Sequence, residues 1–222
     1  MAFSVKSVEL PNDLWLQYVE QGESSGVPVM LLHGLTDSWR SFERAMPHLP
    51  GSIRCFSLTQ RGHGDASRPE TGYRPFDFSE DVAAFMDAVH LDEAVIAGHS
   101  SHSFVAQRFA IDHPERTLGL VLIGAPATLS DKPGVQEMRD SMSKLTDPID
   151  EDFVRRFVES TVARRVPKAF YEAMVEESLK LPARVWRAAF EGILTDDLSE
   201  ERQTIKAPTL IIWGDQDGIC PL

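Results

Sequence analysis

Ser100 is the residue whose surroundings best suit covalent chemistry. A short apolar run ends at Gly98, Ser100 follows two residues later, and apolar residues then recur at helical spacing from Phe104 to Phe109. This pattern predicts a strand, a sharp turn and a helix, with the serine hydroxyl exposed at the tip of the turn. The amide of Ser101 would then begin the helix and point at negative charge developing beside the hydroxyl. On its own, the stretch also fits an ordinary strand-to-helix connection with an exposed serine, because short motifs match by chance.

Apolar runs and helical patterns alternate along the first half of the chain. Such alternation predicts a parallel sheet covered by helices on both faces, with functional sites at the carboxyl ends of its strands. The expected strands cover residues 27–32, 53–58, 94–98 and 118–124, and the expected helices cover residues 78–89, the stretch after Ser100 and a segment running through Phe42 and Met46. Residues 5–10 and 14–19 alternate apolar with polar side chains, which predicts an antiparallel hairpin.

Two of the turns after these strands resemble motifs of the α/β-hydrolase fold superfamily. Gly98-His99-Ser100 is similar to the nucleophile elbow, whose usual form is Gly-x-Ser-x-Gly. His33-Gly34, which ends the first buried strand, resembles the motif that supplies an oxyanion-hole amide from the next residue. The resemblance implies an α/β fold with a mostly parallel sheet, flanking helices and an inserted helical cap.

Two further segments extend the resemblance. The loop from Arg61 to Gly64 is similar to the Arg-Gly-x-Gly loop of the superfamily, which is mainly a marker of the fold. Residues 207–213 form an apolar strand pattern followed by Gly214, and Asp217 stands where the superfamily carries its acid. These matches run from residue 33 to residue 217 and occur in the superfamily's order.

The resemblance assigns four site residues. Ser100 is implied as the catalytic nucleophile and Asp217 as the catalytic acid, with Asp215 as the fallback for the acid. Leu35 and Ser101 are implied as the two main-chain donors of the oxyanion hole. Two amides aimed at a developing oxyanion would lower the barrier by a few kcal/mol.

His102 departs from the superfamily's elbow pattern. It occupies the second small-residue position, two residues after Ser100, where a larger side chain would collide across the turn. Its ring must therefore point away from the strand, or the helix must tilt.

The catalytic order of the superfamily is Ser, acid, His, and all seven histidines of this sequence precede Asp217. We therefore expect the catalytic His, together with the last strand and helix of the fold, beyond Leu222. A fluorophosphonate should label Ser100 in the full-length protein and react little with the 222-residue chain alone.

The segment between the two sheet regions is helical throughout. Its helical patterns cover residues 134–145, 150–163, 167–180 and 182–194. Their apolar residues suit helix-on-helix packing, and the resemblance adds a cap whose inner face lines an apolar pocket. The expected organisation is a core over residues 1–125, a helical cap over 126–206 and a continuation of the core over 207–222.

Composition limits the partners. The chain carries 22 Lys and Arg against 34 Asp and Glu, a net charge of −12, and shows no basic patch, so we expect neither nucleic acid nor a membrane surface as a partner. Two cysteines, Cys55 and Cys220, are too few for a disulfide framework or a metal site, which favours a reduced, cytoplasmic protein. No zinc-hydrolase motif or dinucleotide-binding loop is present in the sequence, so no cofactor or metal is expected.

The function implied by the resemblance is that of a metal-independent serine esterase or lactonase acting on small apolar substrates through an acyl-enzyme. Two alternatives remain open at this point. One is a non-catalytic or slow ligand sensor on the same fold, and the other is a different reaction of the superfamily, such as carbon–carbon bond hydrolysis or perhydrolysis.

Overall fold

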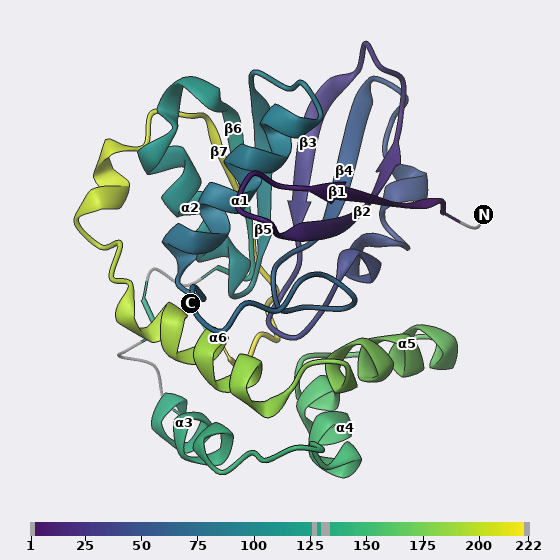
Figure 1. Ribbon diagram of the computed structural model, residues 1–222, viewed down its shortest axis with the longest axis vertical. Coiled ribbons are helices and arrows are strands. Elements are labelled where there is room, and N and C mark those ends of the chain that lie inside the picture. The colour runs from purple at the N-terminus through teal and green to yellow at the C-terminus, as the bar shows by residue number, and fades with distance from the viewer. Residues whose placement is uncertain (1–2, 126–127, 130–133, 220–222) are drawn as a thin grey trace.

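A seven-stranded sheet forms the centre of the computed structural model, which describes residues 3–125, 128–129 and 134–219 (Figure 1). The strand order is β1-β2-β4-β3-β5-β6-β7. The strands are β1 (Val5–Glu9), β2 (Trp15–Gln21), β3 (Val27–Leu32), β4 (Ile53–Thr59), β5 (Ala94–His99), β6 (Thr117–Ile123) and β7 (Thr209–Ile212). The expected hairpin is present as the antiparallel pair β1 and β2, and β4 to β7 run parallel to β3. The mostly parallel sheet predicted from the sequence is confirmed.

The register of the sheet brings the ends of its central strands to one edge. Leu32 of β3 lies opposite Gly98 of β5, and Ile123 of β6 lies opposite both His99 of β5 and Ile212 of β7. The residues that follow these positions in the chain therefore meet beyond the carboxyl ends of the strands, where α/β sheets place their sites.

Helices α1 (Pro75–Ala88) and α2 (His102–Asp112) pack together and carry the largest buried core. Their apolar residues recur every three or four positions, so one stripe of each helix contacts the sheet. The fully buried members of this core include Phe78, Phe85, Phe104, Phe109, Met30, Phe56 and Ile96. The helix expected before the elbow strand begins at Pro75, because proline fits the first turn of a helix.

A smaller apolar cluster contains two short turns, η1 (Trp39–Phe42) and η2 (Met46–His48). Trp39 and Met46 pack there against strand residues that include the buried Cys55 of β4. The single helix expected through Phe42 and Met46 is wrong: the segment forms two 3₁₀ turns instead. Pro47 has no amide hydrogen to continue a helical ladder, so one regular helix cannot run through it.

Four helices lie beyond the carboxyl ends of the parallel strands (Figure 1). They are α3 (Val135–Ser143), α4 (Glu151–Ser160), α5 (Lys168–Leu179) and α6 (Ala183–Thr195). We refer to residues 135–195 as the helical layer. At its centre the fully buried Trp186 ring contacts Phe153 and Phe157, with ring centroids 5.8 and 5.0 Å away. Two short turns, η3 (Pro114–Arg116) and η4 (Glu201–Thr204), complete the elements.

The boundary expected between residues 125 and 126 borders a segment, 126–127, that lies outside the described residues, as do Cys220 and Leu222. Within the described part of the chain, no helix combines the length and the apolar composition needed to cross a bilayer.

Candidate functional site

Ser100 stands on the sharp turn between β5 and α2. Its φ is +51°, a left-handed conformation that costs a non-glycine residue about 1–3 kcal/mol and that clusters at functional sites. Main-chain bonds fix the turn: the Ser100 N–H donates to the Ile123 carbonyl at 2.9 Å, and the Ser103 N–H donates to the Ser100 carbonyl at 2.9 Å. Ser100 itself is half-buried. The turn thus holds a strained serine at the site-bearing edge of the sheet.

Gly98 allows the strand and the helix to approach at this turn. A Cβ atom on Gly98 would lie 2.3 Å from the His102 carbonyl oxygen and 2.8 Å from the Ala106 Cβ. Because main chain cannot yield as a flexible side chain does, only glycine fits this position. This is the steric reason for the first small residue of the elbow pattern.

His102 fits at the second small-residue position because its ring lies against the neighbouring strand end. The His102 side chain is 2% exposed, and its Nδ1–H donates to the His33 carbonyl, which begins the loop after β3. Burial holds the pKa of the His102 imidazole well below its ordinary value, so the ring is neutral. At Gly98 the close neighbour is the main chain of His102 and not its side chain. The imidazole therefore does not obstruct the turn.

The loop after β3, residues 33–37, carries the other expected oxyanion donor. The Asp37 N–H donates to the Gly34 carbonyl at 3.2 Å, which closes a turn around Leu35 and Thr36. Thr36 has a φ of +68° and is fully buried. Among the described residues, neither the Leu35 N–H nor the Ser101 N–H donates a hydrogen bond to the protein. Both amides are therefore available to a ligand oxygen.

Three buried imidazoles support these loops. One ring nitrogen from each of His33, His63 and His102 lies within 4.8 Å of the others, and this group is the candidate for a metal site among the described residues. His33 spends both nitrogens on main chain, donating to the Gly34 carbonyl and accepting from the Gln60 N–H. Burial lowers the pKa of His63 to about 4, and its Nδ1–H donates to the Arg61 carbonyl. Neutral rings anchored in this way tie the loops together.

Asp217 lies beside the end of β6. Its Oδ2 atom is 3.5 Å from the position a Cβ would take on Gly124, whose N–H donates to the Ile212 carbonyl at 2.9 Å. Asp217 is half-buried, whereas Asp215 is exposed. The carboxyl group of Asp217 is therefore next to the strand whose Ile123 carbonyl binds the Ser100 amide.

His99 and Asp37 are site features that sequence reasoning did not single out. A Cβ on Gly34 would lie 3.1 Å from His99 Nδ1 and 3.2 Å from Asp37 Oδ2, so both side chains lie against Gly34 in residues 33–37, which we call the oxyanion loop. Burial lowers the pKa of His99, while the carboxylates of Asp37 and then Asp217 act to raise it. The signal available in the sequence was position alone: His99 precedes the elbow serine and Asp37 ends the His-Gly loop.

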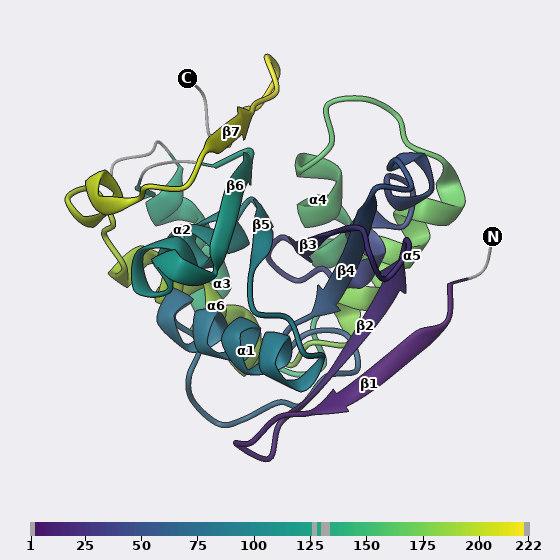
Figure 2. The same ribbon diagram turned by 90° about the horizontal axis from the view of Figure 1, so that it is seen from above.

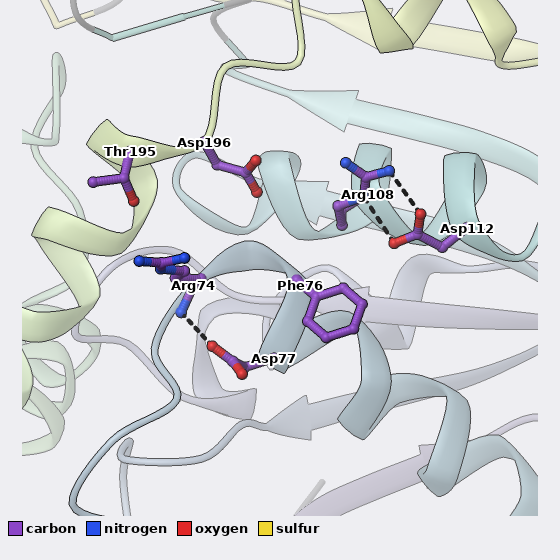
Figure 3. Close-up of a pocket in the computed structure, with 7 residues that line it drawn as sticks. All are labelled: Arg74, Phe76, Asp77, Arg108, Asp112, Thr195 and Asp196. Carbon is purple, nitrogen blue, oxygen red and sulfur yellow. Dashed lines mark hydrogen bonds and ion pairs between the residues drawn. The ribbon is translucent and has the colours of Figure 1, made fainter.

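A pocket of about 400 Å³ lies elsewhere, between the start of α1, the end of α2 and the end of α6 (Figure 3). Its lining residues are Arg74, Phe76, Asp77, Arg108, Asp112, Thr195 and Asp196. Arg108 is already paired with Asp112 and Glu201 at 2.6 and 2.8 Å. None of the expected site residues lines this pocket, and its one arginine on α2 is neutralised by its own neighbours.

The fold and the elbow identify the family: the chain belongs to the α/β-hydrolase fold family, whose model matches residues 27–222. It is 28% identical over 210 residues to the AB hydrolase superfamily protein YisY of Bacillus subtilis, covering 88% of this chain and 76% of that protein. It is 36% identical to epoxide hydrolase B of Mycobacterium tuberculosis over 107 residues, 47% of this chain and 30% of that protein.

Solved structures show the same fold. An esterase (EaEST) from Exiguobacterium antarcticum superposes with a TM-score of 0.83 at 20% identity, covering 98% of this chain and 83% of that one.

Proposed function

We propose that the protein is a serine hydrolase that cleaves small apolar carboxylic esters or lactones through an acyl-enzyme. The observation that carries this proposal is the strained Ser100 at the elbow, together with the amides of Ser101 and of Leu35 in the loop after β3, which have no hydrogen-bond acceptor among the described residues. A hydroxyl nucleophile beside two free N–H donors is suited to attack on an acyl carbon, where negative charge develops on one oxygen.

In the proposed reaction, a base removes the Oγ proton of Ser100 and Oγ attacks the carbonyl carbon. The Leu35 and Ser101 amides bind the oxyanion. The bond to the alcohol oxygen then breaks, and the alcohol leaves with the proton held by the base. Water hydrolyses the acyl-serine to release the carboxylic acid and restore Ser100.

The remaining roles follow from the chain order Ser, acid, His. We propose that Asp217 orients and stabilises a histidine that follows it in the chain, because its half-buried carboxyl group lies at the same sheet edge as Ser100. The preference for apolar substrates is supported by Met138, Phe153, Phe157 and Phe170 of the helical layer, which pack against the core yet remain partly exposed.

The test is labelling of the full-length protein with a fluorophosphonate, combined with hydrolysis of p-nitrophenyl butyrate. Ser100→Ala should abolish labelling and lower kcat at least about 10³-fold, because removing a serine nucleophile leaves only binding and the oxyanion hole. Ser141→Ala is the matched control, since that exposed hydroxyl donates to the Glu137 carbonyl of its own helix. EDTA should leave the rate unchanged. Ligand binding without labelling or turnover would instead indicate a sensor.

A further inference from the structure

The oxyanion loop contains a residue in a conformation that its own type disfavours. Thr36 stands third in the turn from Gly34 to Asp37 and has a φ of +68°. A positive φ at the third position is the mark of a type II turn, where glycine is favoured. A β-branched residue in this region is an outlier that persists only when its surroundings hold it. The conformation of the loop therefore depends on contacts from outside the turn.

Those contacts come from the end of α5 in the helical layer. The hydroxyl oxygens of Thr36 and Ser178 are 2.9 Å apart. The Ser178 hydroxyl also donates to the Thr36 carbonyl, with 3.4 Å between the two oxygen atoms. Both residues are fully buried. Because water is excluded from this pair, its two contacts hold the Thr36 side chain and the adjoining peptide in place.

Ser178 is itself held on both sides. The Trp186 Nε1–H donates to the Ser178 carbonyl at 3.3 Å, which joins it to the aromatic centre of the helical layer. The neighbouring Glu177 is 6% exposed and pairs with Arg40 at 3.5 Å and with Lys180 at 3.0 Å. Arg40 belongs to η1, which follows the oxyanion loop, and α5 lies beside η1 (Figure 2). The end of α5 is thus seated on the segment that carries the loop.

We propose that Ser178 is a positioning residue for the oxyanion hole: it holds Thr36 in its left-handed conformation and thereby aims the Leu35 amide. The proposal rests on the proposed function. If Ser178 has this role, the oxyanion hole forms only when the helical layer is docked. The layer would then affect the rate of the chemical step as well as substrate access.

The experiment is a double-mutant cycle in the full-length protein with Ser178→Ala and Thr36→Gly. Ser178→Ala should lower kcat for p-nitrophenyl butyrate about tenfold with KM unchanged, since outright loss of one oxyanion donor costs about 10²–10³. Glycine adopts a positive φ freely, so in the Thr36→Gly background Ser178→Ala should change kcat by less than about twofold. Ser160→Ala is the matched control, because that hydroxyl donates to the Phe157 carbonyl of its own helix.

Hydrogen exchange of a peptide covering residues 33–40 supplies a readout that is independent of turnover. Exchange should be faster in Ser178→Ala and unchanged in Ser160→Ala. Equal losses of kcat in both backgrounds, or unchanged exchange in Ser178→Ala, would overturn the proposal. If the wild-type protein neither labels nor hydrolyses esters, the proposed function fails, and the exchange experiment alone then decides whether Ser178 holds the loop.

Discussion

The strands that precede Ser100 and Asp217 in the chain, β5 and β7, are built differently. β5 pairs with β3 on one side and β6 on the other, and its Ile96 is fully buried. β7 pairs with β6, and all four of its residues are exposed, with Ile211 66% exposed. The nucleophile therefore depends on the packed core, whereas the proposed acid follows a strand that, within the described residues, pairs with β6 alone. Changes at β5 should alter stability and activity together, and changes at β7 should separate the two.

The sharpest separation is expected from Asp217→Asn. It should lower kcat about 10²–10⁴-fold, since an amide cannot stabilise the imidazolium or fix its tautomer as a carboxylate does. The free energy of unfolding should change by less than about 1 kcal/mol, because the side chain is only half-buried. Asp215→Asn, at an exposed position, is the matched control and should keep the wild-type rate. The opposite pattern would assign the acid to Asp215.

Two glycines test the packing of the same two regions. Gly98→Ala should destabilise the protein by about 3 kcal/mol or more and abolish labelling of Ser100, because the new Cβ would lie 2.3 Å from a main-chain oxygen. Among the described residues, no heavy atom lies within 4 Å of the Cβ that Gly214→Ala would add, so this substitution should be nearly neutral. Urea unfolding of both variants measures the difference. Equal stabilities would contradict the close approach at the elbow.

The buried imidazoles predict that the stability of the packed core around β5 depends on pH. His63 has a folded-state pKa of about 4 against an ordinary value of 6.5. Between these two pH values the imidazole is protonated in the unfolded chain and neutral in the folded chain. Stability should fall as pH drops from 6.5 toward 4, with His63 contributing about 2 kcal/mol between pH 7 and pH 5. His63→Asn should flatten this slope in urea unfolding, and His48→Asn, at an exposed position, should not. An unchanged slope would show that His63 is not held neutral.

The smallest effects come from trimming one methyl group on each strand. Ile96→Val should cost about 1 kcal/mol, the usual range for a methyl removed from a packed core. Ile211→Val removes a methyl group that is mostly in water and should cost less than about 0.5 kcal/mol. Thermal unfolding compares the pair. A larger loss at Ile211 would show that β7 has contacts beyond those of the described residues.

Much of the fold could be predicted because each element carries its own pattern. The strand over Val27–Leu32 and the elbow strand from Ala94 are continuous apolar runs, and the helix after Ser100 repeats at 3.6 residues. The helix predicted through Phe42 and Met46 was wrong because the apolar spacing there suits a helix, whereas Pro47 prevents one regular helix from running through the segment.

The relation between the loops could not be predicted. That His102 binds the His33 carbonyl depends on the register of β3 against β5, and that Ser178 binds Thr36 depends on where the helical layer docks. The positive φ of Thr36 and the approach of Asp37 to His99 arise from the same tertiary contacts. Local sequence patterns carry no signal for such long-range pairs.

The buried thiol of Cys55 is a natural reporter of how often the central sheet opens. The thiol is fully buried on β4 among the residues around Trp39, and burial raises its pKa, so the reactive thiolate is scarce as well as shielded. Alkylation at this position requires the strand to leave its neighbours. Iodoacetamide should therefore modify Cys55 at a rate that reports the opening of the central sheet, and no engineered probe is needed.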